Sequence, residues 1–195
     1  RSTLFPYTTL FRSLFMPQRP VLIGELNLLR STQGVSLRYA QSWLQSGFPL
    51  SEDLPLIDQE FLPADKGTAV GAVDDARPDR WGEQVIRYIE KPPRLSLLEF
   101  LCFAGDERFG ALGVSTSADA YLPRKLGALP SLADADELQE IVRKVLANEP
   151  VPQAQKRLLA PGVSFGGARP KALIEIGGEQ WVIKFSAGDP GDAPL

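Results

Sequence analysis

The chain has 195 residues, a formal net charge of −3, 44% hydrophobic residues and 23% charged residues. This length and composition predict one globular domain or two small ones, with enough apolar side chains for a core. The negative charge excludes a general attraction to nucleic acid or anionic membranes, no apolar run reaches the length of a membrane span, and the absence of histidine excludes histidine-based zinc sites and catalytic triads.

The first fifteen residues form no usable pattern, because Pro6 interrupts the apolar residues before a helix could form. Residues 3–13 resemble the translation of a sequencing-library adapter. We therefore interpret residues 1–15 as a non-native segment, with a natural hydrophobic N-terminus as the alternative. We expect this segment to pack poorly and to carry no function, and we expect natural residues to be missing at this end.

Two strands are predicted next, at residues 19–28 and 35–40, with a turn between them. Prolines leave residues 49–57 without a regular element, and residues 64–79 have the composition of a loop. A helix is predicted from residue 79 to residue 90, ended by a proline pair. Its apolar face contains Trp81, Val85, Ile86 and Ile89.

A second helix is predicted after Ser96, which forms a capping-box pattern with Glu99, and Gly105 fits its end. Cys102 lies in this apolar stretch and is predicted to be a buried structural residue, and a single cysteine fits a reducing cytoplasm. Residues 108–115 are predicted to form a short strand. The clearest helix lies within residues 131–150, with an apolar face made of Leu138, Ile141, Val142, Val145 and Leu146.

A Gly-rich loop and a β-hairpin follow near the C-terminus. A glycine pair separates two apolar runs, Ala172–Ile176 and Gln180–Phe185, which is a strong hairpin signal. Before it stands the segment SFGGARPK, whose backbone N–H groups could bind an anion beside Arg169 and Lys171. A lysine, Lys184, lies on the second strand. Protein kinases place a strand lysine under a Gly-rich loop at the ATP phosphates, although each feature alone usually marks only a turn or a solvent-facing lysine.

Four segments in order resemble the HipA-like family, the toxin-type serine/threonine kinases of bacterial toxin–antitoxin systems. They are PLSEDLPL, DDARPDRWGEQVI, LLEFLCFAGDERFGALGVS and SFGGARPKALIEIGGEQWVIKFSAGD, and the resemblance covers residues 19–195. It implies that Lys184 contacts the nucleotide phosphates and that Ser164 is a regulatory autophosphorylation site. A serine that only hydrogen-bonds the turn is the alternative for Ser164. The implied loop over the ATP phosphates contains Gly166, Gly167, Ala168, Arg169, Pro170 and Lys171.

The catalytic part of such a kinase is not in this sequence. The family's catalytic loop resembles Asp-x-His-x-x-Asn, and the chain has no histidine. Asp189 and Asp192 are interpreted as solvated loop charges rather than metal ligands. We therefore predict no catalytic and no metal-binding residue here, and an inactive fragment. The predicted parent uses ATP and Mg²⁺ to phosphorylate a protein substrate, and Gly-Gly and Arg-Pro in the loop depart from the best-studied pattern, which leaves that substrate open.

The predicted fold class is α+β. After the non-native segment at 1–15, the resemblance implies a HipA-like N-terminal subdomain at 16–118, a helical connector at 119–160 and the incomplete, β-rich beginning of a kinase-like ATP-binding lobe at 161–195. The C-terminal helical lobe would be missing. One alternative is a non-catalytic module that binds a helix-turn-helix antitoxin, and DNA only through that antitoxin. Another is a kinase-like protein with a changed reaction. The expected location is the cytoplasm, without membrane contact.

Overall fold

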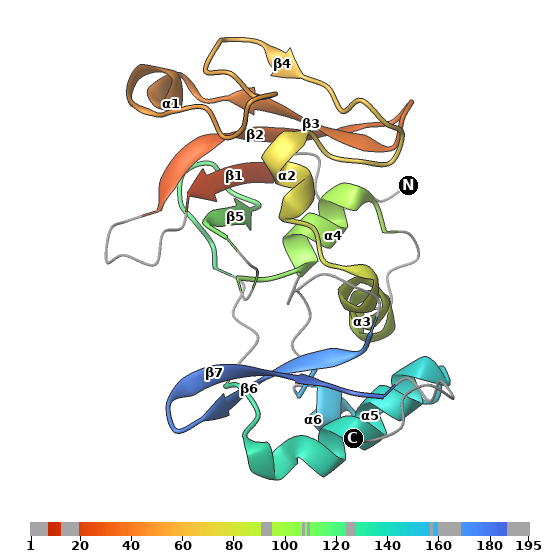
Figure 1. The fold of residues 1–195 in the computed structure, drawn as a ribbon. Coiled ribbons are helices and arrows are strands. Elements are labelled where there is room, and N and C mark those ends of the chain that lie inside the picture. Colours follow the sequence, from red (N-terminus) through yellow and green to blue (C-terminus); the bar gives the residue numbers. More distant parts are fainter. Residues whose placement is uncertain are drawn as a thin grey trace.

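The computed structural model of the chain describes residues 8–12, 20–90, 95–106, 108, 110–123, 128–156, 158–159 and 169–186. They form two units with helix α3 (Arg80–Glu90) between them (Figure 1). We call residues 8–78 and 95–123 the N-terminal unit and residues 128–186 the hairpin unit. Antiparallel sheets and short helices occur in both, so the fold class is α+β, as predicted.

The N-terminal unit is built on a five-stranded antiparallel sheet in the order β4-β3-β2-β1-β5. The two predicted strands are confirmed as β2 (Val21–Leu29) and β3 (Gly34–Tyr39), joined by a tight turn. β4 (Glu60–Phe61) adds a short edge. β5 (Leu112–Ser115) is shorter than the strand predicted for residues 108–115, and Arg108 is buried before the strand begins.

The expectation that residues 1–15 pack poorly is wrong for the backbone of Thr8–Arg12. These five residues form β1, which pairs antiparallel with β2 on one side and with β5 on the other (Figure 1). A strand ladder needs only extended backbone with free N–H and C=O groups, so a sequence without a clear apolar pattern can still fill a gap between two strands. The non-native origin of the segment stays a prediction.

Six helices longer than one 3₁₀ turn are described. In the N-terminal unit, α1 (Gln41–Ser46), α2 (Gly71–Asp75) and α4 (Leu97–Phe103) pack on the sheet. The capping box predicted for α4 is present, since the Ser96 side chain accepts from the Glu99 N–H and Glu99 accepts from the Ser96 N–H. The loop predicted for residues 64–79 was wrong at α2, a helix too short for periodicity to reveal.

One hydrophobic core lies between the sheet and α1, α2 and α4. It includes Ile23, Leu26 and Leu37 from the strands and Leu98 and Leu101 from α4, all at most 1% exposed. Cys102 is buried beside them, as predicted for a structural cysteine. Burying such aliphatic side chains contributes about 1.5–3 kcal/mol each, so this core is a large favourable contribution to the stability of the N-terminal unit.

A buried arginine, Arg108, binds backbone carbonyl groups of this unit. The Arg108 guanidinium donates to the carbonyl oxygens of Gly105 (2.8 Å), Ala76 (3.2 Å) and Leu101 (2.7 Å). These oxygens lie at or just beyond the C-terminal ends of α2 and α4, where carbonyl groups lack helical partners. Burial lowers the pKa of Arg108, and the nearby Tyr121 and Asp106 oppose that effect.

The hairpin unit has a second core. Its helices are η1 (Leu132–Asp134), α5 (Ala135–Leu146) and α6 (Gln153–Lys156), and its strands are β6 (Lys171–Ile176) and β7 (Glu179–Lys184). Of the predicted apolar face of α5, four residues are buried and Leu146 is 42% exposed. The four buried residues, Leu138, Ile141, Val142 and Val145, pack with Ala172 and Ile174 of β6.

Helix α3 packs against both units. Trp81, Val85 and Tyr88 belong to the core of the hairpin unit, whereas Ile86 packs on Phe100 and Phe103 next to the N-terminal unit. In Figure 1, α3 accordingly lies between the sheet above and the hairpin below. Each face of α3 is therefore buried by a different part of the chain, which fixes the hairpin relative to the N-terminal unit.

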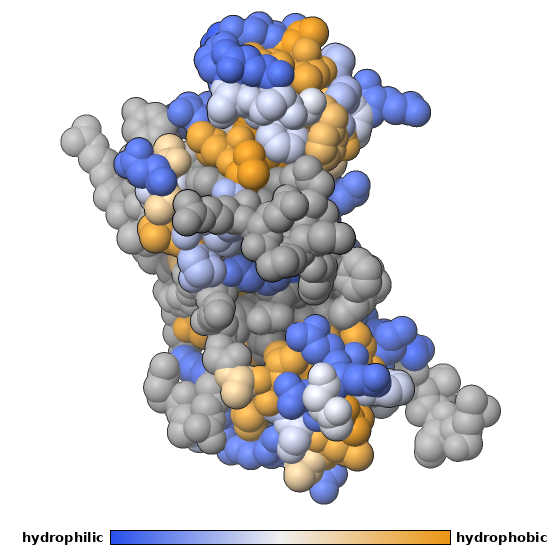
Figure 2. All heavy atoms as spheres, turned by 90° about the vertical axis from the view of Figure 1, so that its left-hand side faces the viewer, coloured by the Kyte–Doolittle hydropathy of each residue, from blue (hydrophilic) through white to orange (hydrophobic). Residues whose placement is uncertain are grey.

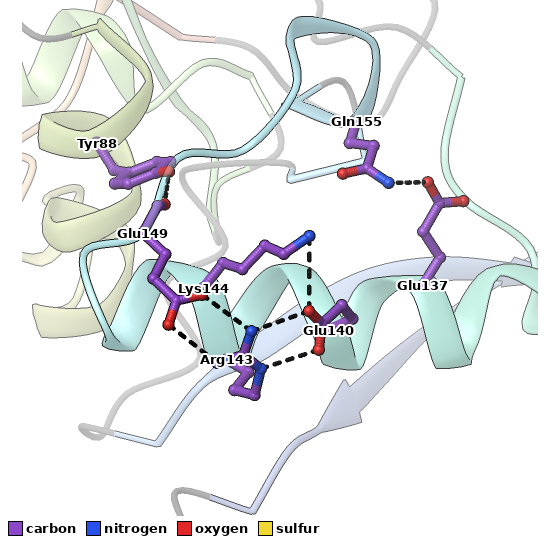
Figure 3. Close-up of polar contacts among 7 residues, drawn as sticks. All are labelled: Tyr88, Glu137, Glu140, Arg143, Lys144, Glu149 and Gln155. Carbon is purple, nitrogen blue, oxygen red and sulfur yellow. Dashed lines mark hydrogen bonds and ion pairs between the residues drawn. The ribbon is translucent and has the colours of Figure 1, made fainter.

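Polar contacts secure the outside of α5. Figure 3 shows the Arg143 guanidinium between the carboxylates of Glu140 and Glu149, at 2.9 Å from each. Arg143 lowers the pKa of Glu140 to about 2, and both carboxylates raise the pKa of Arg143. Tyr88 of α3 donates to the backbone carbonyl of Glu149, so this network also links α3 to the end of α5.

Candidate functional site

The candidate site is the β6–β7 hairpin, which the sequence predicted correctly. The two strands pair in register from Ile176↔Glu179 at the turn to Lys171↔Lys184 at the open end. Gly177 (φ 61°) and Gly178 (φ 85°) form the turn. Positive φ at both central residues is the geometry of the type I′ turn, whose twist matches that of the strands, and glycine adopts it without strain.

The hairpin is supported on one side only. Glu175 donates its N–H to the Pro130 carbonyl oxygen (2.7 Å), so the segment before η1 covers part of the free edge of β6. β7 has no strand on its outer side within the described residues. Two apolar residues near the turn, Ile176 and Trp181, are 38% and 52% exposed. On the face drawn in Figure 2, hydrophobic residues also gather over the lower part of the molecule.

Lys184 ends β7 with its side chain exposed. It makes no ion pair with any residue that the structure describes. The next residue, Phe185, is buried in the core and donates its N–H to the Pro170 carbonyl oxygen (2.9 Å), which extends the ladder past Lys184. The backbone of Lys184 is thus held firmly while its ammonium group is accessible to a ligand.

Lys171 lies directly opposite Lys184 in the register, yet its environment is the reverse. Its side chain is 1% exposed, and its ammonium group forms an ion pair with a carboxylate oxygen of Asp79, whose side chain is 6% exposed. A buried charge must be paired in this way, because an isolated ammonium group inside a protein loses its hydration without compensation. The two lysines face each other in the hairpin register, but Lys171 is paired with Asp79, whereas the exposed Lys184 is accessible to a ligand.

The first turn of α3 holds Lys171 at two points. The indole N–H of Trp81 donates to the Lys171 carbonyl oxygen (2.7 Å), while Asp79 pairs with the ammonium group. Asp79 also caps the helix, since its second carboxylate oxygen accepts from the Gly82 N–H (2.7 Å). The positive end of the helix dipole stabilises a carboxylate at this position. Asp79 therefore caps α3 and also pairs with the first residue of β6.

Several predicted site residues lie outside the described residues: Ser164, Gly166, Gly167, Ala168, Asp189 and Asp192. Arg169 is described and exposed, and Pro170 is buried at the start of β6. The structure therefore brings together Pro170, Lys171 and Lys184 at the open end of the hairpin, with Arg169 next to them along the chain. The assignment of all these residues to ATP stays a prediction.

Sequence reasoning did not identify Asp79 as a residue of this site. It lies ninety-two positions before Lys171, and such a separation leaves no local pattern. The available signal was the segment PDRWG, in which an aspartate precedes a helical run and can act as N-cap. That signal predicts the cap but not the lysine partner, which only the packing of α3 on β6 supplies.

The N-terminal unit has a cavity of about 380 Å³ beside α2. Gly71 begins α2 at φ 41°, and a Cβ there would lie 2.8 Å from both Asp53 carboxylate oxygens, so this wall requires glycine. The Asp74 carboxylate accepts from the Ala69 N–H (2.7 Å) at the same place. Its lining residues are Asp53, Leu54, Phe61, Leu62, Pro63, Ala64, Asp65, Thr68, Ala69, Val70, Gly71 and Asp74.

These features define an α+β protein in which a sheet domain, through α3, carries a β-hairpin with one buried and one accessible lysine. A family model described as the HipA N-terminal domain matches residues 18–115. The chain therefore belongs to the HipA family. The match covers the N-terminal unit from before β2 to the end of β5, together with α3. No curated protein matches the chain, and none of the described helices is long and apolar enough to cross a membrane.

Proposed function

We propose that the chain supplies the ATP-phosphate-binding hairpin of a HipA-like serine/threonine kinase, whose catalytic loop lies in a longer parent protein. The observation that carries this proposal is Lys184, an accessible ammonium group on a fixed strand, near the end of the Gly-rich loop, in a chain with a HipA N-terminal domain. The parent transfers the terminal phosphoryl group of ATP to a hydroxyl group of a protein substrate, in the cytoplasm.

The described residues fit a bound phosphate in charge and access. Lys184 forms no ion pair with a carboxylate among them. Arg169 is also exposed, and it lies two residues before the first residue of β6. In kinases of this kind the lysine orients and neutralises the nucleotide phosphates, and Mg²⁺ shares that task. The glycines at 166 and 167 would bring backbone N–H groups to the same oxygens. Mg²⁺ ligands are not assigned to this chain.

The decisive experiment replaces Lys184 by alanine in the parent. A charge-assisted contact of this kind contributes about 1.5–3 kcal/mol to binding, and more in the transition state. We expect phosphoryl transfer to fall below detection in Lys184→Ala, measured with radiolabelled ATP and Mg²⁺. Lys66→Ala, at an exposed lysine of the N-terminal unit, is the matched control and should retain activity. Normal activity in Lys184→Ala would refute the assignment.

Ser164 is proposed as the regulatory phosphosite of the same loop. A phosphate there carries roughly −2 charge and would compete with ATP for the backbone N–H groups of the glycine pair. Mass spectrometry of the parent after incubation with ATP and Mg²⁺ should find phosphate at Ser164 and none in Ser164→Ala. An active parent that never carries phosphate at this position would overturn the proposal. The chain by itself should gain none.

A second candidate is a non-catalytic binding module for a helix-turn-helix antitoxin, which would reach DNA only through that partner. The cavity beside α2, inside the HipA N-terminal domain, favours it. Co-expression of the chain with a helix-turn-helix protein encoded beside it tests this candidate. Co-purification that Leu62→Glu at the cavity wall abolishes would support it, whereas failure to co-purify would refute it.

A further inference from the structure

We propose that Asp79 is a positioning residue for nucleotide binding: it holds Lys171 at the exit of the Gly-rich loop and leaves Lys184 as the ammonium group that meets phosphate. This inference rests on the proposed function above. It assigns a role to a residue of the HipA N-terminal domain that acts through the hairpin, and it separates the roles of two lysines that face each other across β6 and β7.

Lys171 lies at the end of the Gly-rich segment, where β6 begins. It immediately follows the segment SFGGARP and is the first residue of β6, so its backbone fixes where the loop returns to the sheet. Both its carbonyl oxygen and its ammonium group are bound by the first turn of α3, through Trp81 and Asp79. The loop exit is therefore fixed to α3 from two directions, and a shift of α3 would move it.

The second step is the electrostatic state of the pair. Both side chains are almost completely buried, at 1% and 6% exposure, so breaking the pair leaves an uncompensated charge in the interior. The Lys171 ammonium group is engaged before any nucleotide arrives. Lys184, opposite it and exposed, has no such carboxylate partner among the described residues. Phosphate recognition thus falls to Lys184, and Lys171 acts through its position.

The third step connects the pair to the rest of the protein. Asp79 caps α3 through its contact with the Gly82 N–H, and α3 packs on Phe100 and Phe103 of α4 through Ile86. The N-terminal unit therefore reaches the loop exit through one short path of packed side chains. A loop displaced by about 1 Å can lose about 100-fold in catalytic efficiency, so this path matters for the reaction.

The first arm of the test uses the 195-residue chain without nucleotide and measures amide hydrogen exchange in β6 and β7. Asp79→Asn keeps the size of the cap but leaves the Lys171 ammonium group unpaired, and we expect exchange to rise about 100-fold. The double variant Asp79→Asn/Lys171→Met, without either charge, should recover most of the protection. Asp58→Asn, which breaks the exposed 3.0 Å pair with Arg38, is the matched control and should change little.

Asp79→Asn that exchanges no faster than Asp58→Asn would overturn the positioning role. If Asp79→Asn does not fold, the double variant and Lys171→Arg, which keeps the charge, decide the question in the same assay. A double variant that is as unprotected as Asp79→Asn would show that the unpaired Lys171 ammonium group does not cause the loss, which overturns the electrostatic part of the proposal.

The second arm uses the parent kinase and separates KM for ATP from kcat. We expect Asp79→Asn to raise KM about tenfold, because a misplaced loop exit weakens nucleotide binding. A merely structural loss would lower the amount of active enzyme, and so kcat, without changing KM. The double variant should bind ATP better than Asp79→Asn. The opposite order would show that the Lys171 ammonium group itself contacts nucleotide, which overturns the proposal.

Failure of the proposed function is distinguishable from failure of this inference. If Lys184→Met leaves KM and kcat unchanged, the kinase assignment falls, and the hydrogen-exchange arm still judges whether Asp79 holds the hairpin. If Lys184→Met abolishes transfer but Asp79→Asn behaves as Asp58→Asn in both arms, the kinase assignment stands and the positioning role is refuted.

Discussion

Among the residues that the structure describes, each of the two units buries one cation, and the two cations are stabilised in different ways. In the N-terminal unit, Arg108 is surrounded by three backbone carbonyl oxygens at the ends of two local helices. In the hairpin unit, Lys171 is paired with Asp79, which caps the start of α3. The N-terminal unit thus stabilises its buried cation with its own residues. The hairpin unit depends on the cap of α3 for its counter-charge and on α3 for part of its core.

The same contrast appears in the hydrophobic cores. The core under the five-stranded sheet is made by residues of the N-terminal unit alone. The core under the hairpin takes three residues from α3, namely Trp81, Val85 and Tyr88. A two-stranded hairpin is marginal in water unless a further element covers it. The hairpin is therefore stable because α3 and α5 cover it, and α3 connects it to the HipA N-terminal domain.

The largest expected effect comes from removing the α3 side chain that serves the hairpin. The Trp81 side chain is only 4% exposed, so Trp81→Ala leaves a cavity in the core and removes the hydrogen bond to the Lys171 carbonyl oxygen. We expect the unfolding free energy to fall by about 3–5 kcal/mol. Hydrogen exchange should rise in β6 and β7 more than in β2 and β3. Trp43→Ala, in the core of the N-terminal unit, is the matched control with the opposite pattern. If both variants raised hydrogen exchange equally in both units, the two units would not be separate in stability.

The next largest effect is expected at Arg108, which binds three backbone carbonyl oxygens in the N-terminal unit. Arg108→Met keeps most of the apolar stem but leaves the carbonyl oxygens of Gly105, Ala76 and Leu101 without their donor. We expect a loss of about 2–4 kcal/mol in urea denaturation, since each buried unsatisfied acceptor is costly. Arg38→Met, at a 57% exposed arginine, should change stability by less than about 0.5 kcal/mol. If both variants have the same small effect, Arg108 does not hold the helix ends.

The smallest expected effect concerns the exposed network on α5. Arg143 lowers the pKa of Glu140 from its ordinary 4.5 to about 2, so the ionised form is favoured in the folded state. A lowered carboxyl pKa stabilises the fold above pH 4.5, and this contribution is lost as the pH falls through about 2. The difference in urea midpoint between the wild type and Glu140→Gln should therefore be small at pH 7 and shrink towards pH 2.

The control for this titration is Glu52→Gln, at an exposed glutamate of the N-terminal unit. Its urea midpoint at pH 7 should stay close to that of the wild type, because an exposed side chain away from special features contributes little to stability. A gap for Glu140→Gln that persists unaltered at pH 2 would mean that the side chain acts through its shape and not through its charge. High salt should reduce the effect of Glu140→Gln as well, because exposed ion pairs are screened.

The sequence by itself determined the local elements whose signals lie within a few residues. The capping box at Ser96, the apolar face of α5 and the glycine pair of the hairpin each depend on near neighbours, so their helices and strands were predicted with small errors at the ends. The family was identified the same way, from motifs in order along the chain, and the family match confirms it over residues 18–115.

The tertiary structure alone decided how these elements meet. The strand Thr8–Arg12 exists because β2 and β5 offer it backbone partners on both sides, and its own side chains gave no such signal. The partner of Lys171 could not be predicted either, because an ion pair between residues ninety-two positions apart forms only when α3 packs on β6. Burial then separates two lysines that the hairpin pattern makes equivalent: packing encloses Lys171 with a carboxylate and leaves Lys184 in solvent.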